Sequence, residues 1–233
     1  MAGVAPGEAP APPAAQAAND GAGAPVYTQD WFSLNESVWP PLFAPYAGRP
    51  GLRALEVGVF EGRATRWLLE RVLTGAGATI DCVDTFEGSD EYAPMGVEVS
   101  GLRARFEANV GAWPGRVRIH AGRSAEVLRR LDGPWDVAYI DGSHAAPDVL
   151  ADAILAWPRI VPGGLVIFDD YAWDWFARPE KNPRLGIDAF LSCHVGQYEI
   201  LHFGYQVALR KLAAYDAAVA ANLLATRPTG HPG

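Results

Sequence analysis

Short apolar runs alternate with amphipathic segments along most of the chain. The apolar runs are nearly continuous, which is typical of strands that are buried on both faces. We expect such strands over 53–59, 78–84, 116–120, 135–141 and 164–170. The intervening segments carry apolar residues at helical spacing, and we expect helices over 62–73, 101–113, 124–131 and 185–196, together with one that begins at 146 and ends near Trp157 and Pro158.

This alternation predicts a parallel sheet that is covered by helices on both faces. The last two strands differ, because 198–203 and 205–211 are separated only by Gly204, which permits a tight reversal. We therefore expect an α/β fold: a Rossmann-like, seven-stranded, mostly parallel sheet with a C-terminal antiparallel hairpin. The Ala-rich tail from about Leu212 is expected to be helical.

The N-terminal residues differ in composition from the rest of the chain. Residues 1–25 are rich in Ala, Pro and Gly and lack the basic and apolar regions of a signal peptide, so we expect a disordered leader. The 233-residue length suits one sizeable core, and we expect a single domain over 26–233. Within it, 26–50 would form an N-terminal helical cap segment. No apolar run is long enough to span a bilayer, and we expect a cytoplasmic protein without membrane contact.

Charge and cysteine content narrow the classes of partner. The formal net charge is −8 and no basic block occurs, which argues against a nucleic-acid surface. Cys82 and Cys193 lie far apart among apolar residues and are interpreted as reduced thiols. A protein substrate stays open.

A glycine turn follows the first expected strand. Glu56, Gly58 and Gly62 are spaced so that the strand can turn sharply and the next helix can point its N–H groups into a site. A dinucleotide fingerprint requires a second glycine where this chain has Phe60. The turn therefore disfavours an NAD site.

Acidic residues stand at the carboxyl ends of the expected strands, where ligands bind in such sheets. They are Asp84, Asp141 and the adjacent pair Asp169 and Asp170. Adjacent strands lie about 4.8 Å apart, so Asp141, Asp169 and Asp170 could converge on one ion. Ligation by oxygen alone suits Mg²⁺ or Mn²⁺, and a cation would offset the repulsion between the paired carboxylates.

Several motifs together resemble a known family. The turn "LEVGVFEGRAT" resembles motif I of the class I S-adenosylmethionine-dependent methyltransferases. The strand-end acids resemble the site of metal-dependent O-methyltransferases of the catechol O-methyltransferase type. Together "DWFS", "EVGVFEGRAT", "DGSH", "PGGLVIFDDY", "GIDAFL" and "GYQVALRK" are similar to a bacterial subfamily with antibiotic-tailoring and sugar O-methyltransferases, over roughly residues 30–211.

The resemblance implies S-adenosyl-L-methionine and Mg²⁺ or Mn²⁺ as cofactors, and it implies site residues. Asp84 would hold the ribose hydroxyls, although a role as a loop cap stays open. The metal ligands would be Asp141, Asp169 and Asp170. The implied cofactor contacts are Glu56, Gly58, Val59, Phe60, Gly62, Asp84, Thr85, Gly122, Arg123, Ser124 and Asp141.

His144 occupies the position at which the catechol enzyme has a lysine base. One interpretation is a general base, whose ring a helix start and a nearby metal would keep neutral. The other is an ordinary polar residue after a helix cap at Ser143. Tyr171, Trp173 and Trp175 are expected either to form an acceptor wall or simply to pack. Trp31, Phe32 and Trp39 could close the site.

The sequence thus predicts a metal-dependent O-methyltransferase that acts on a small-molecule hydroxyl, sugar or catechol-like, in natural-product tailoring. Two alternatives stay open. One is a protein of the same fold with different metal chemistry, such as a hydroxylase. The other is a non-catalytic nucleoside-binding module. The resembled relatives are often oligomers, so a homo-oligomer is also an expectation.

Overall fold

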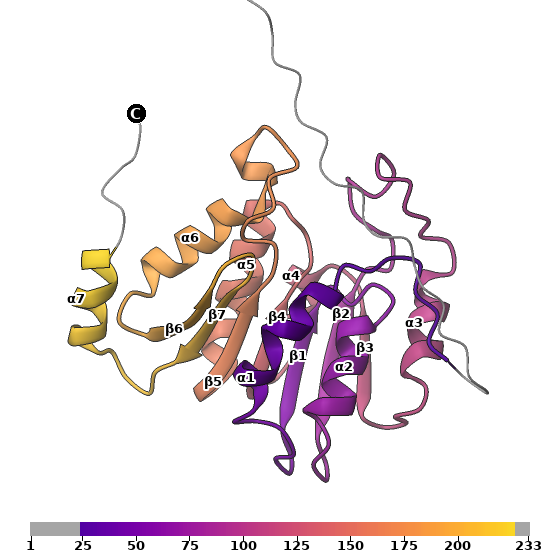
Figure 1. The fold of residues 1–233 in the computed structure, drawn as a ribbon, viewed down its shortest axis with the longest axis horizontal. Coiled ribbons are helices and arrows are strands. Elements are labelled where there is room, and N and C mark those ends of the chain that lie inside the picture. Colours follow the sequence, from indigo (N-terminus) through magenta and orange to yellow (C-terminus); the bar gives the residue numbers. More distant parts are fainter. Residues whose placement is uncertain (1–23, 227–233) are drawn as a thin grey trace, which may run out of the picture.

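The computed structural model describes residues 24–226, so the expected leader over 1–25 lies, except for its last two residues, outside the described part. One seven-stranded sheet runs through the molecule in the order β3-β2-β1-β4-β5-β7-β6. Helices flank it on both faces (Figure 1). The predicted Rossmann-like α/β fold is therefore confirmed.

All strands but one run in the same direction. β1 pairs in parallel with β2 and β4, β2 with β3, and β4 with β5. β7 runs antiparallel between β5 and β6, which gives the expected terminal hairpin. The strands are β1 (Arg53–Val57), β2 (Thr79–Asp84), β3 (Val117–Ala121), β4 (Trp135–Ile140), β5 (Ile160–Phe168), β6 (Tyr198–Phe203) and β7 (Val207–Lys211).

The helices match the predicted order but not every boundary. Helix α4 is shorter than expected, whereas α5 ends at Ala156, close to the predicted end at Trp157 and Pro158, and β5 begins at Ile160. The α-helices are α1 (Trp39–Phe43), α2 (Arg63–Arg71), α3 (Leu102–Val110), α4 (Ser124–Val127), α5 (Ala146–Ala156), α6 (Pro183–Cys193) and α7 (Ala217–Thr226). Three 3₁₀ turns are η1 (Ser33–Ser37), η2 (Trp157–Arg159) and η3 (Pro179–Lys181).

Two apolar cores lie on opposite faces of the sheet. Along β1, Ala54 belongs to the core under α1 and α2, whereas Leu55 and Val57 belong to the core under α5 and α6. Burial on both faces explains why the strands are almost continuously apolar. Each fully buried large apolar side chain contributes about 1.5–3 kcal/mol relative to exposure.

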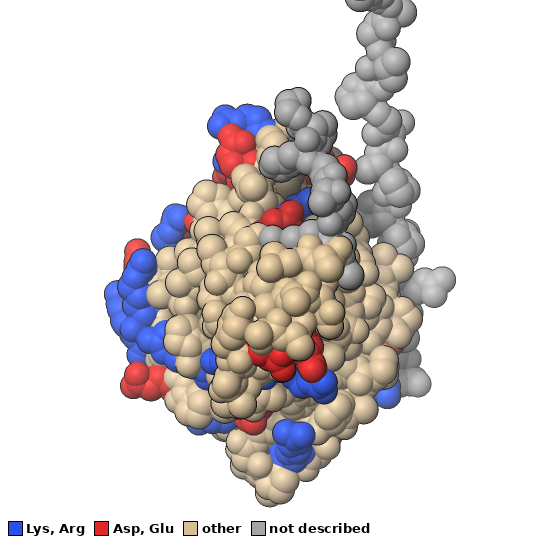
Figure 2. Space-filling view, turned by 90° about the vertical axis from the view of Figure 1, so that its left-hand side faces the viewer, with Lys and Arg blue, Asp and Glu red and all other residues tan. Residues whose placement is uncertain are grey.

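The face at the β6 and α7 end carries few charged side chains (Figure 2). Exposed apolar residues at this end include Ile200, Leu201, Phe203 and Tyr215. Within 24–226, no helix has both the length and the apolar character that a bilayer span requires.

The parallel strands end at the upper edge of the sheet in Figure 1, and long loops follow β2 and β5 there. This edge carries the expected strand-end acids.

Candidate active site at the carboxyl ends of the strands

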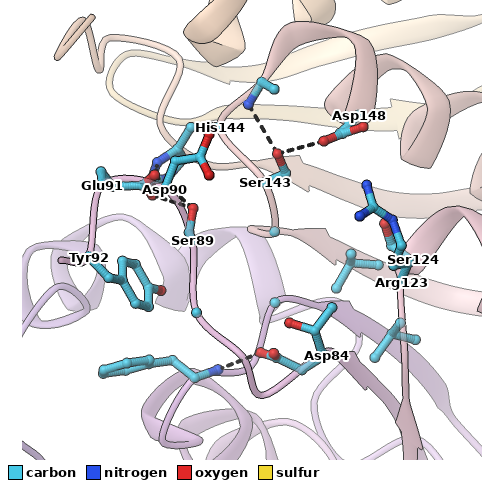
Figure 3. Close-up of a pocket in the computed structure, with 18 of the residues that line it drawn as sticks. Asp84, Ser89, Asp90, Glu91, Tyr92, Arg123, Ser124, Ser143, His144 and Asp148 are labelled. Atoms are coloured by element: carbon cyan, nitrogen blue, oxygen red, sulfur yellow. Dashed lines mark hydrogen bonds and ion pairs between the residues drawn. The ribbon is translucent and has the colours of Figure 1, made fainter. Parts of the chain in front are cut away.

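A cavity of about 340 Å³ opens beyond the ends of β1, β2, β3 and β4 (Figure 3). Eight residues that the sequence singled out line it: Gly58, Phe60, Asp84, Thr85, Gly122, Arg123, Ser124 and His144. They come from four separate loops, which only the sheet order brings together.

Gly58 makes the closest approach in the glycine turn. Its φ is +80°, and a Cβ at this position would lie 1.8 Å from the carbonyl oxygen of Asp141. Gly62 serves packing instead, since a Cβ there would lie 2.8 Å from the Phe106 ring on α3. Gly58 thus lets the loops after β1 and β4 meet beneath the cavity.

Asp84 organises the turn and also faces the cavity. Its Oδ2 accepts the backbone N–H groups of Val59 (2.8 Å) and Phe60 (3.0 Å), and its Oδ1 accepts that of Phe86 (2.7 Å). These bonds hold Phe60 at a φ of 45°, which is unusual for a residue with a side chain. The loop-cap interpretation is therefore correct. Each carboxylate oxygen can accept more than one hydrogen bond, so Asp84 has the capacity to bind a ligand as well.

Besides Asp141, three of the implied cofactor contacts lie outside the cavity lining: Glu56, Val59 and Gly62. Glu56 is fully buried, and its carboxylate has no hydrogen-bond partner among the described residues. Burial raises the pKa of this carboxyl to about 8, against the influence of Thr65. The assignment of these three residues to cofactor binding stays a prediction.

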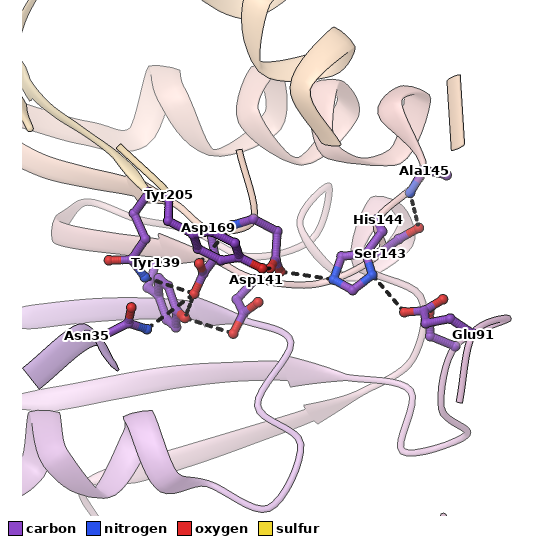
Figure 4. A network of polar contacts seen from close by, with 12 residues as sticks. Asn35, Glu91, Tyr139, Asp141, Ser143, His144, Ala145, Asp169 and Tyr205 are labelled. Carbon is purple, nitrogen blue, oxygen red and sulfur yellow. Dashed lines mark hydrogen bonds and ion pairs between the residues drawn. The ribbon is translucent and has the colours of Figure 1, made fainter. Parts of the chain in front are cut away.

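The expected metal ligands form a buried polar network (Figure 4). The Tyr139 hydroxyl lies 2.8 Å from Asp141 Oδ2 and also contacts Asp169 Oδ2. Burial, followed by the charges of Asp169 and Asp170, raises the pKa of Asp141 well above its ordinary value. Burial, followed by Asp170, raises the pKa of Asp169 to about 7. The network therefore resists ionisation, and it holds an excess of negative charge only when its carboxyls ionise together.

The three carboxylates do not surround one point. Among the described residues, no group of three His, Cys, Asp or Glu side chains is arranged to hold a metal ion. Asp170 has a φ of 59°, and its Oδ2 lies 2.9 Å from His144 Nε2. The expected convergence of all three carboxylates is thus absent among the described residues, because Asp170 pairs with His144, and their assignment as metal ligands stays a prediction. The all-oxygen donor set and its excess negative charge nevertheless fit a hard divalent cation.

His144 lies between two acidic groups. Its Nδ1 forms an ion pair with Glu91 Oε1 at 2.7 Å, and its Nε2 contacts Asp170. Burial opposes the charged ring, but the bonds to Asp170 and Glu91 outweigh it and raise the pKa of His144 to about 10. These contacts favour the charged ring, in contrast to the neutral ring that is expected beside a metal ion. The residue also precedes the helix, since α5 begins only at Ala146.

The aromatic candidates have different surroundings. Trp173 lies against His144, with ring centroids 4.2 Å apart. Tyr171 packs on Phe203 and donates to Asp188, so it faces the helix side, and Trp175 is 47% exposed. None of these three lines the cavity.

In the leading segment, Trp31 contacts the cavity-lining rings of Phe60 and Tyr92. Phe32 and Trp39 belong to the core instead, which corrects the expectation that they close the site. They are buried because they pack beneath α2 and against β4.

Sequence reasoning missed the residues that hold the acids in place: Glu91, Tyr139, Tyr205 and Gln206. Glu91 lies in a loop without periodicity, and Tyr139 reads as an ordinary strand residue. The "GYQ" sequence at 204–206 was the available signal, but only as part of a resemblance.

Known proteins were compared with the chain. The model of a family described as "Methyltransferase domain" matches residues 55–171, which is half of the chain. No curated protein sequence matches.

Among solved structures, the chain is similar to the MycE methyltransferase of the mycinamycin biosynthetic pathway, in complex with Mg, S-adenosylhomocysteine (SAH) and mycinamycin VI. The identity is 20%, the TM-score is 0.57, and the match covers 80% of this chain and 50% of MycE. The chain thus spans about half the length of that protein. A second structure is the O-methyltransferase TomG of Streptomyces achromogenes, involved in tomaymycin synthesis and in complex with S-adenosylmethionine. It has 17% identity, a TM-score of 0.53, and coverage of 76% and 77% of the two chains.

At these identities the solved structures support the fold, and the family match supports the assignment of the domain. The glycine turn, Asp84, Asp141 and the acidic pair all lie inside the matched residues. The chain therefore belongs to the methyltransferase-domain family.

Proposed function

We propose that the protein is an S-adenosylmethionine-dependent, divalent-metal-dependent O-methyltransferase that acts on a small-molecule hydroxyl. One observation carries this proposal: the glycine turn, Asp84 and His144 line a single cavity, with the acidic network beside it. A methyl donor bound in this cavity would therefore lie close to a proton acceptor.

The donor end lies at Gly58 and Asp84. The Asp84 carboxylate would accept hydrogen bonds from the ribose hydroxyls, and Gly58 leaves room for the ligand beside the backbone. The segment after β3 lines the same cavity with Gly122, Arg123 and Ser124. These residues would contact the adenine ring of the donor. The donor and its product, SAH, in the TomG and MycE complexes support this assignment.

The acceptor end lies at His144 and the acidic network. The acceptor oxygen would attack the sulfonium methyl carbon, the carbon–sulfur bond would break, and SAH would leave. His144 would take the hydroxyl proton once the ring has lost its own, and such base catalysis typically contributes about 10²–10⁴-fold. Asp141 and Asp169, with Asp170 as a third donor, would hold the cation. A divalent cation there would lower the pKa of the acceptor hydroxyl and orient it.

The proposed acceptor is a sugar or catechol-like compound, as in natural-product tailoring. Mg in the MycE complex supports a divalent cation, and the pathways named for MycE and TomG support natural-product tailoring. The net charge of −8 supports a small molecule over a nucleic acid as partner. The homo-oligomer and the cytoplasmic location stay predictions, and light scattering of the purified chain would test the former.

The test is calorimetric titration of the full chain with SAH, with and without EDTA, beside metal analysis. We expect micromolar binding, about one divalent ion per chain, and transfer of labelled methyl to catechol or sugar acceptors. Without SAH binding the methyltransferase proposal fails. An oxygen-dependent product would favour the hydroxylase alternative. Binding without turnover, indifferent to Mg²⁺, would favour the nucleoside-binding module.

A further inference from the structure

The terminal hairpin supplies a partner for each member of the acidic pair. β5 and β7 pair antiparallel with Phe168 opposite Val207. The next positions outward place Asp169 beside Gln206 and Asp170 beside Tyr205. The Gln206 Nε2 donates to Asp169 Oδ2 at 2.8 Å, and the Tyr205 hydroxyl donates to Asp170 Oδ1 at 2.7 Å.

The side-chain amide of Gln206 has only one favourable orientation. Its Oε1 accepts the indole N–H of Trp39 at 2.9 Å, while its Nε2 faces Asp169. An indole N–H can only donate, and an ionised carboxylate can only accept. A flipped amide would place donor against donor and acceptor against acceptor. Trp39 therefore aims the Gln206 amine at Asp169.

Trp39 also orients the second group that holds Asp169. Its ring packs edge-on against Tyr139, with centroids 4.9 Å apart. The Tyr139 hydroxyl in turn contacts both Asp169 and Asp141. Asp169 Oδ2 is thus held from two sides by groups that rest on one buried tryptophan.

We propose that Gln206, oriented by Trp39, is a positioning residue that fixes the Asp169 carboxylate beside Asp141. Gln206 is 2% exposed and does not line the cavity, so it acts through Asp169 alone. The role as a cation-site residue rests on the proposed function. The leading segment is thereby part of the site's framework, although only Trp31 among its aromatic candidates contacts rings that line the cavity.

The test measures Mn²⁺ affinity of the full chain by calorimetry in three variants. Gln206→Leu removes the donor to Asp169, and Trp39→Phe removes the indole N–H but keeps an aromatic ring. Loss of a partner behind a metal ligand typically weakens metal binding about 10–100-fold. We expect about 10-fold or more for Gln206→Leu, a smaller loss for Trp39→Phe, and unchanged SAH affinity in both.

Tyr46→Phe is the matched control. The buried Tyr46 hydroxyl donates to the carbonyl of Gly163 at 2.6 Å and has no bond to the acidic network. This variant loses one buried hydrogen bond, as Trp39→Phe does, but Mn²⁺ affinity should not change. If Gln206→Leu does not fold, the Mn²⁺ affinities of Trp39→Phe and Tyr46→Phe are compared instead, and this comparison decides the test.

The outcomes separate the positioning role from the proposed function. If the wild type binds Mn²⁺ and the folded variants bind it equally tightly, the positioning role is overturned and the function stands. If the wild type binds no Mn²⁺, the metal part of the function fails. The positioning role then depends on kinetics: a lower kcat at unchanged KM for the donor supports it, and an unchanged kcat overturns it.

Discussion

The imidazole of His144 joins two loops across the cavity. Its Nδ1 pairs with Glu91, from the loop after β2, and its Nε2 contacts Asp170, from the loop after β5. Trp173 lies against the same ring. A single side chain thus positions both loops at the acceptor end of the candidate site.

Replacing His144 with Gln should remove proton transfer but leave the donor end intact. We expect methyl transfer to fall about 10²–10⁴-fold, because base catalysis is lost, with SAH affinity within about twofold of the wild type. Rates at saturating donor and acceptor, beside SAH titration, measure both. A variant that retains full kcat would show that His144 only ties the loops together.

Glu91 should matter less than His144 and in a different way. Glu91→Gln keeps the side-chain shape but removes the charge that faces Nδ1. We expect a smaller fall in kcat than for His144→Gln, since the ring keeps its contact with Asp170. Equal losses in the two variants would instead assign Glu91 a direct part in the chemistry.

Asp84→Asn tests the donor end. The change removes the charge that would bind a diol and weakens acceptance of three backbone N–H groups. We expect SAH affinity to fall about 10-fold or more, since hydrogen bonds to charged groups are worth about 1.5–3 kcal/mol. Titration calorimetry measures it, and circular dichroism checks the fold. Glu107→Gln, at an exposed position of α3, is the control, and its SAH affinity should not change.

Gly58→Ala should disrupt the turn between β1 and the cavity. A Cβ there would lie 1.8 Å from the Asp141 carbonyl oxygen, in addition to the strain of a φ of +80°. Gly115 offers a matched control, because its φ is +76° but no atom lies within 4 Å of a Cβ. We expect Gly115→Ala to cost about 1–2 kcal/mol in unfolding free energy and Gly58→Ala clearly more, with loss of SAH binding. Urea unfolding compares them, and equal costs would contradict the close approach.

Asp152 on α5 should make stability depend on pH. It is 1% exposed, and its Oδ1 has no hydrogen-bond partner in the described part of the chain. Burial raises its pKa from 3.8 to about 7, against a hydrogen bond from Ser124. Below pH 3.8 the Asp152 carboxyl is protonated in both the folded and the unfolded state, so no charge has to be buried on folding. As pH rises towards 7 the unfolded state ionises first, so this group's contribution to stability falls.

Asp152→Asn removes this titration. The variant should gain stability over the wild type as pH rises from 4 to 8, by about 2–4 kcal/mol at the upper end. Urea unfolding of both proteins at several pH values gives the difference. If the difference in unfolding free energy does not change with pH, the pKa of Asp152 is not raised in the folded protein.

The positions of the strands along the chain and the terminal hairpin were predictable from local pattern. Continuous apolar runs indicate buried parallel strands, and Gly204 between two such runs indicates a reversal. The strand-end acids followed from the same pattern, because parallel strands end at one edge. The end of α5 near Pro158 was predictable as well, because proline cannot continue a helix, but the early end of α4 at Val127 was not.

The sequence by itself determined which chemical groups stand at the functional edge: a glycine turn, Asp84, His144 and three carboxylates. Tertiary structure decided what those groups contact. Gln206 reaches Asp169 only through the antiparallel register of β7, and His144 meets Glu91 only because the loop after β2 folds over the cavity. The pKa of His144 follows from those contacts and not from its place before a helix. Such long-range pairs leave no periodic trace along the chain, since hydrophobic spacing records burial and not the identity of a distant neighbour.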